Sequence, residues 1–130
     1  MDKKRSTLPK NERLSWKRHI DFLFQKGASF VAFPLRVIYL PIDKDDSETP
    51  VSMLVSISKK KLKHAVDRNY IKRRIRESYR LRKHDLTQFY AEKNKKLLLA
   101  FLYLDNTKAS YEKIDRAITK AIQTLQEKPE

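Results

Sequence analysis

The sequence predicts a single α+β domain in which a small sheet packs against three helices. Apolar residues recur at helical spacing in three segments, alternate along two short segments, and form one unbroken run over residues 97–104. Helix, strand, strand, helix, strand and helix therefore follow one another, an order typical of the α+β class. The length of 130 residues, of which 40% are hydrophobic, suits one domain with a core of its own.

The first predicted helix covers residues 15–26 and follows a flexible basic arm over residues 1–12. Ser15 can cap its N-terminus, and Gly27, the only glycine in the chain, stands where a left-handed residue ends many helices. The apolar face of this helix consists of Trp16, Ile20, Leu23 and Phe24. We expect one domain over residues 13–126, followed by a tail over residues 127–130.

Two strands are predicted next, over residues 35–40 and 51–57. In the first strand, one face carries Leu35, Val37 and Tyr39. In the second, the residues that alternate inward are Val51, Met53, Val55 and Ile57. An acidic loop over residues 43–50 separates the two strands, which can pair across it as a hairpin.

A basic helix follows, from about Ala65 to Tyr79 or beyond. At about 100° per residue, one stripe of this helix is apolar and consists of Ile71, Ile75, Tyr79 and Leu86. An adjoining arc of about 140° is polar and consists of Arg68, Asn69, Lys72, Arg73, Arg76 and Arg80. One face of the helix therefore packs, and its neighbour is placed to bind.

The last two predicted elements are a strand and a helix. Residues 97–104 are apolar at every position, which suits a strand that is buried on both faces. A turn over residues 105–107 leads into a helix over residues 108–126. Its apolar face consists of Tyr111, Ile114, Ile118, Ala121, Ile122 and Leu125.

The positive charge of the chain is concentrated in one segment. The formal net charge is +14, and residues 59–83 contain twelve lysines and arginines against two acids, or +10. A patch of this density attracts a phosphate backbone and binds it by releasing counterions. The alternative is a solvated helix face, but few acids are present to neutralise it. The balance favours a polyanion site.

The sequence excludes several other kinds of site. Without cysteine the chain has no disulfide scaffold, thiolate zinc site or cysteine nucleophile. Its three histidines lie in separate segments without metal-ligand spacing, and the acidic loop lacks the glycine and final glutamate of a calcium loop. We expect no catalytic and no metal-binding residues in this chain. Because residues 97–104 fall far short of the ~20 residues of a membrane span, we expect a cytoplasmic protein.

The segment from Lys59 to Glu77 resembles the signature of the bacterial ribonuclease P protein subunit. That signature is a lysine-rich lead-in, then Ala-Val-x-Arg-Asn, then x-x-Lys-Arg-x-x-Arg, and residues 65–76 match it. Flanking features occur in the family's order, including Arg13-Leu14 before a short helix and Phe24-Gln25-Lys26-Gly27 at its end. The resemblance covers about residues 13–125.

This resemblance implies both a fold and a function. The fold is ribonuclease P protein-like and related to ribosomal S5 domain 2-like folds, with a mixed sheet of about four strands, three helices and a left-handed β-α-β crossover. The protein is an accessory subunit that binds the catalytic RNA, one protein per RNA, and the 5′ leader of precursor tRNA. The RNA performs the endonucleolytic hydrolysis and binds most of the Mg²⁺ that it requires, and no membrane is involved.

Two sets of site residues follow from the resemblance. The expected contacts with the catalytic RNA are Lys59, Lys60, Arg68, Asn69, Lys72, Arg73, Arg76 and Arg80. The expected leader cleft, between the sheet and the first helix, is formed by Ile20, Phe24, Val37 and Tyr39. Aromatic rings can stack on unpaired bases of any sequence, although Phe24 and Tyr39 can equally be core residues.

The sequence departs from the family pattern at three places. Tyr70 stands where a third basic residue is usual, His64 where Asn is frequent, and Leu62-Lys63 where a glycine is common. Contacts around residues 62–70 can therefore differ from those of relatives.

Three other functions compete with this interpretation. A ribosomal or other structural RNA-binding protein needs the same basic patch, and RNA-dependent cleavage of precursor tRNA separates the two. A DNA-binding helix is disfavoured because no dimerisation element is evident. A membrane-surface helix is disfavoured because residues 59–83 lack a broad, bulky apolar face.

Overall fold

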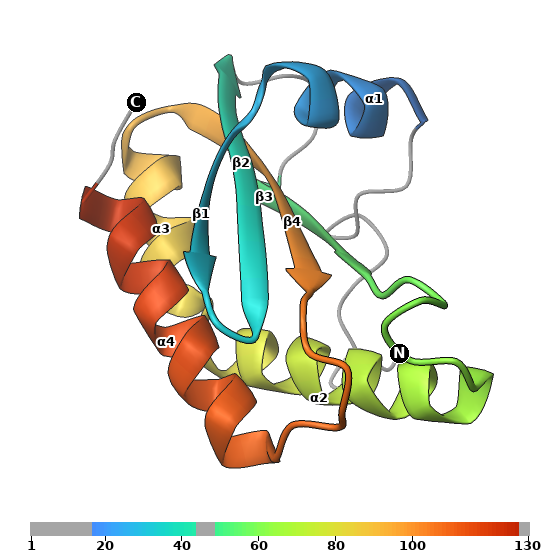
Figure 1. Ribbon diagram of the computed structural model, residues 1–130. Helices are drawn as coiled ribbons and strands as arrows, with labels where there is room; N and C mark the ends of the chain where they lie inside the picture. Colours follow the sequence, from blue (N-terminus) through green and yellow to red (C-terminus); the bar gives the residue numbers. More distant parts are fainter. Residues whose placement is uncertain (1–16, 44–48, 128–130) are drawn as a thin grey trace, which may run out of the picture.

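The computed structural model describes residues 17–43 and 49–127, which form four helices and four strands (Figure 1). The predicted arm over residues 1–12, the Ser15 cap and Trp16 lie outside the described residues. The elements are α1 (Lys17–Lys26), β1 (Ala28–Ala32), β2 (Leu35–Asp43), β3 (Val51–Ser56), α2 (Ala65–Arg82), α3 (His84–Glu92), β4 (Lys95–Tyr103) and α4 (Tyr111–Glu127). The predicted α+β class with a small mixed sheet is confirmed.

The sheet has the order β1-β2-β4-β3, with β4 inside it. β2 pairs antiparallel with β1 and β4, whereas β3 and β4 are parallel and joined through α2 and α3. The predicted hairpin between β2 and β3 is therefore wrong. β4 lies between them because it is apolar on both sides, and only an inner strand buries Leu98 and Leu99 together, both 0% exposed.

Two elements were not predicted as separate units. β1 was not predicted as a strand because it lies at the edge of the sheet, where its apolar residues are not uniformly buried. Val31 is 51% exposed, while Ala32 is buried. The basic helix ends at Arg82, and α3 begins at His84. The break lets α3 bury Leu86 and Tyr90, so the described chain has four helices rather than three.

Gly27 has a different role from the predicted one, because its φ is not positive. Its N–H donates a hydrogen bond to the Leu23 carbonyl at 2.8 Å. A Cβ at this position would lie 2.5 Å from that oxygen and 2.9 Å from the Cγ2 of Ile38. Glycine is therefore required here by the close approach of the Leu23 carbonyl and of the Ile38 side chain on β2, and not by a left-handed backbone.

The two faces of the sheet carry cores of different size. The larger core joins one face to α2, α3 and α4, and it contains the predicted inward residues Val51, Met53, Val55 and Ile57. The smaller core is formed on the other face by Leu23, Leu98 and Ala100. Of the described helices, α1 alone packs there, against β2 and β4 (Figure 1). The described helices therefore cover the α1 face less completely than the other face.

Candidate nucleic-acid interface

The loop between β3 and α2 presents two of the predicted RNA contacts. Lys59 and Lys60 are exposed at its start. The loop is held at Ser58, whose carbonyl accepts hydrogen bonds from the N–H groups of Lys61 at 3.1 Å and Leu62 at 3.2 Å. Leu62 is only 5% exposed and belongs to the larger core. The leucine that departs from the family pattern thus anchors the loop.

Arg68 joins this loop to the first turns of α2. Its Nη1 donates to the carbonyl oxygens of Leu62 at 2.8 Å and Lys63 at 2.9 Å. A guanidinium has five N–H donors, so three remain without a protein acceptor among the described residues. Arg68 can therefore fix the loop and still offer donors to a phosphate.

The middle of the predicted arc is open to solvent. Asn69 and Arg73 are exposed, and Lys72 and Arg76 are half-buried. Within the described part of the chain, Asn69, Lys72 and Arg73 have no hydrogen-bonded or ion-paired side-chain partner. Two uncompensated cations and a free amide therefore lie within one turn of α2. This group can bind phosphates, and the amide can also reach a 2′-hydroxyl or base edge.

The far end of the arc differs, because Arg80 is paired on its own helix. Its Nε and Nη2 donate to the Glu77 carboxylate at 3.3 and 2.8 Å. This hydrogen bonding raises the pKa of Arg80 above its ordinary value. Among the predicted RNA contacts, Arg80 thus already has a carboxylate beside it.

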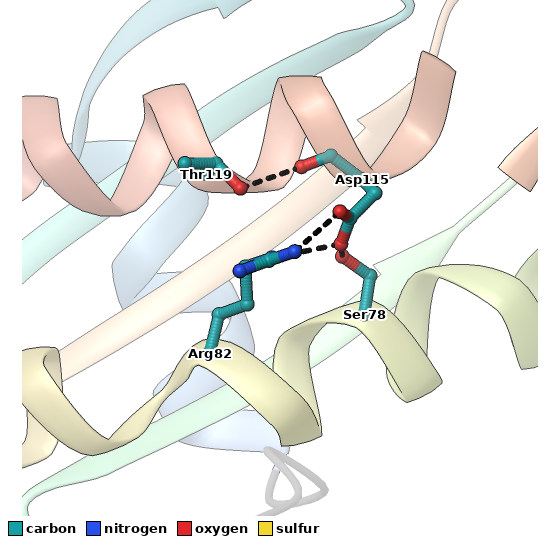
Figure 2. A network of polar contacts seen from close by, with 4 residues as sticks. All are labelled: Ser78, Arg82, Asp115 and Thr119. Atoms are coloured by element: carbon teal, nitrogen blue, oxygen red, sulfur yellow. Dashed lines mark hydrogen bonds and ion pairs between the residues drawn. The ribbon is translucent and has the colours of Figure 1, made fainter. Parts of the chain in front are cut away.

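α2 is joined to α4 by a network of hydrogen bonds that was not predicted from the sequence (Figure 2). Arg82 donates to both oxygens of the Asp115 carboxylate, at 2.8 and 2.6 Å, and the buried Ser78 hydroxyl donates to the same carboxylate at 2.7 Å. The Arg82 hydrogen bonds hold the pKa of Asp115 below its ordinary value. Thr119 donates to the Asp115 carbonyl at 2.8 Å. Arg82 and Ser78 lie 33 and 37 residues from Asp115 in the sequence, so no local motif reveals these contacts between α2 and α4.

The four predicted leader residues lie on two sides of the sheet. Val37 is fully buried in the larger core, and Tyr39 packs against that core with its ring 5.8 Å from that of Phe30. Ile20 packs against the smaller core instead, and Phe24 is 45% exposed on α1. The structure therefore does not bring the four residues together.

On the α1 face, β2 presents its alternate positions. These are Ile38, Leu40 and Ile42, which are partly buried against the smaller core. Strand alternation places these residues on one side of β2 and Val37 and Tyr39 on the other. The sequence does not show which of the two sides α1 covers. A cleft between α1 and the end of β2 is lined among described residues by His19, Asp21, Phe22, Gln25, Ile42 and Asp43, and includes none of the four.

The described residues contain neither a metal-binding group nor a membrane-spanning helix. Over residues 17–43 and 49–127, no three His, Asp or Glu side chains gather as a metal-binding group. None of the helices in these ranges has the length and apolar character needed to cross a membrane. The feature that stands out is a basic helix, locked to its neighbours on one side and exposed on the other. This arrangement defines a small α+β nucleic-acid-binding protein.

Comparisons with known proteins give this class a family. A family model described as Ribonuclease P matches residues 8–126. The ribonuclease P protein component of Porphyromonas gingivalis is 36% identical over 115 residues, covering 88% of this chain and 83% of the relative. That of Chlorobaculum tepidum is 36% identical over 109 residues, covering 78% and 70%.

Solved structures agree with the fold. The RNase P protein from Thermotoga maritima matches with a TM-score of 0.65 at 16% identity, over 87% of this chain and 96% of that one. The Staphylococcus aureus RNase P protein matches with a TM-score of 0.64 at 19% identity, over 87% and 94%. The chain belongs to the ribonuclease P protein family, which confirms the resemblance found in residues 59–77. It is the protein subunit of the enzyme that matures the 5′ end of tRNA, and its partner is ribonuclease P RNA.

Proposed function

We propose that the exposed arc of α2 and the β3–α2 loop form the surface that docks on ribonuclease P RNA. The observation that carries this proposal is the group of Asn69, Lys72 and Arg73, which lacks protein partners among the described residues. Lys59, Lys60 and the remaining donors of Arg68 extend the surface at one end. Arg76 lies in the same arc, and Arg80 contributes less because Glu77 compensates its charge.

In this proposal the RNA carries the chemistry and this chain carries none of the catalytic residues. Mg²⁺ supports the hydrolysis and is held mainly by the RNA. The protein screens phosphate repulsion and places the substrate, one protein per RNA, in the cytoplasm where precursor tRNA is made. The +10 charge of residues 59–83 supports this role, because it lowers the cost of bringing two RNAs together.

We also propose that the 5′ leader of precursor tRNA contacts the α1 face. Phe24 supports this proposal because nearly half of its side chain remains exposed beside Ile20. An exposed ring can stack on an unpaired base of any identity. Ile38 lies on the same side of β2, whereas Val37 is buried in the larger core and Tyr39 packs against that core, so both act by supporting the strand.

The experiment is cleavage of a precursor tRNA at low Mg²⁺ by a bacterial ribonuclease P RNA, with and without this protein. We expect strong stimulation and no cleavage by the protein alone. The control is the Lys72→Ala/Arg73→Ala variant, which leaves the core intact. Tight RNA binding without stimulation, even with the cognate RNA, would instead indicate a structural RNA-binding protein.

A further inference from the structure

Tyr70, where the family usually has a basic residue, is surrounded by cations in this chain. The guanidinium carbon of Arg74 lies 4.2 Å from the centroid of the Tyr70 ring, and its Nη2 donates a hydrogen bond to the Tyr70 hydroxyl. Lys108, from the segment between β4 and α4, places its Nζ 5.3 Å from the same centroid. The ring centroid of Tyr111 lies 5.9 Å from the same guanidinium carbon. We call these four residues the Tyr70 cluster.

The charge of Arg74 is not balanced by a carboxylate. Arg80 and Arg82 are paired with Glu77 and Asp115, but Arg74 has no acidic partner among the described residues. Its Nε is buried and has no hydrogen-bond acceptor. A buried donor left without an acceptor costs free energy. Asp67 lies 3.4 Å from Lys108, so the cluster and this carboxylate together carry a net charge of +1.

The cluster adjoins the surface that we assign to RNA. Tyr70 follows Asn69 in sequence, and it lies about 60° around the helix axis from Arg73. Arg74 continues the same turn toward α4. A planar guanidinium flattened on an aromatic ring is pre-organised to bind a phosphate through two of its N–H groups. Tyr70 therefore brings together one cation from α2 and one from the segment between β4 and α4. It does so at the position where the family usually has a basic residue.

We propose that the Tyr70 cluster is a further phosphate-binding contact for ribonuclease P RNA, with Arg74 and Lys108 as the phosphate ligands. Tyr70 is a positioning residue that holds both cations. The inference rests on the proposed docking of α2 on this RNA. It extends the RNA surface around the helix onto the segment before α4.

The salt dependence of RNA binding tests the two ligands. We expect Arg74→Gln to weaken binding several-fold and to reduce the slope of log K against log salt by about 0.7 to 0.9. Lys108→Ala should act in the same direction but less, because Asp67 partly compensates the charge of Lys108. Lys120→Ala is the matched control, since Lys120 is exposed on α4 and outside the cluster. Asp67→Asn should act in the opposite direction and strengthen binding, because it removes the only carboxylate beside Lys108 among the described residues.

A crosslinking experiment locates the contact independently of affinity. Because the natural chain has no cysteine, Lys108→Cys and Lys120→Cys each carry a single thiol for a benzophenone label. We expect crosslinks to the RNA from position 108 and none from position 120. If wild-type protein binds the RNA but Arg74→Gln and Lys108→Ala behave like Lys120→Ala, the cluster is not a contact. If wild-type protein does not bind at all, the proposed function itself fails.

Discussion

Arg73 and Arg82 lie nine positions apart on the same helix, yet they have different roles. Arg82 donates to both oxygens of Asp115 and ties α2 to α4, whereas Arg73 is exposed and has no partner in the described part of the chain. Both count equally in the net charge. The comparison shows that the number of basic residues does not distinguish the binding side of α2 from its structural side. What distinguishes them is whether each basic side chain has a carboxylate partner.

The largest effect should follow from removing two unpaired cations together. We expect Lys72→Ala/Arg73→Ala to weaken binding to ribonuclease P RNA about 100-fold at low salt, because two phosphate contacts are lost. The salt slope should fall by about 1.4 to 1.8. Filter binding across a salt series measures both quantities, and thermal melting checks that the fold is retained. An unchanged slope would mean that these side chains do not touch phosphates.

The opposite result is expected on the paired side. Asp115→Ala deprives the buried Ser78 hydroxyl and Arg82 of their shared acceptor, and it should destabilise the fold by about 1 to 3 kcal/mol. Urea denaturation measures this loss. At temperatures where the variant is folded, its salt slope for RNA binding should match wild type. A flattened slope with undiminished stability would reverse the roles that we assign to the two sides.

Arg68 combines both roles and sharpens the comparison. Arg68→Lys keeps the charge but loses the fork that grips the carbonyls of Leu62 and Lys63. We expect a roughly threefold to tenfold loss of RNA affinity with little change in salt slope, since the loop loosens. Arg68→Ala should lose affinity and also flatten the slope. Equal slopes in the two variants would show that Arg68 acts on the loop alone.

The smallest predicted effect is a pH dependence of stability. The pKa of Asp115 in the fold lies below the unfolded value of about 3.9, so the unfolded chain takes up its proton first as the pH falls. The ionised carboxylate therefore stabilises the fold fully above about pH 5, and this contribution is lost as the pH falls through the folded pKa. The difference in free energy of unfolding between wild type and Asp115→Asn should shrink below about pH 4. Urea titrations at several pH values measure it, and a difference that stays constant as the pH falls below about 4 would contradict the linkage.

The sequence predicted the elements whose pattern is local. The unbroken apolar run became β4, and the stripe of Ile71, Ile75 and Tyr79 became the packed face of α2. Strand order was less accessible, because β4 enters between β2 and β3 from far along the chain. The short loop between β2 and β3 suggested that these strands pair as a hairpin. They do not pair, because β4 buries both of its faces by lying between them.

The candidate site was predicted in composition but not in pairing. The motif identified the arc from Arg68 to Arg80, since charge and helical spacing are visible in a sequence. That Arg80 is compensated and Arg73 is not depends on side-chain geometry. The placement of Val37 and Tyr39 could not be foreseen either, because alternation defines two faces of a strand without showing which helix covers each.

The most direct test compares Arg73→Ala with Arg82→Ala, two variants with the same chemical change on one helix. The measurement is the slope of log K against log salt for binding to ribonuclease P RNA. We predict that Arg73→Ala lowers this slope by about 0.7 to 0.9 and that Arg82→Ala leaves it at the wild-type value while lowering stability. Equal slopes in the two variants would contradict the account, because the pairing of a cation would then have no bearing on its contact with RNA.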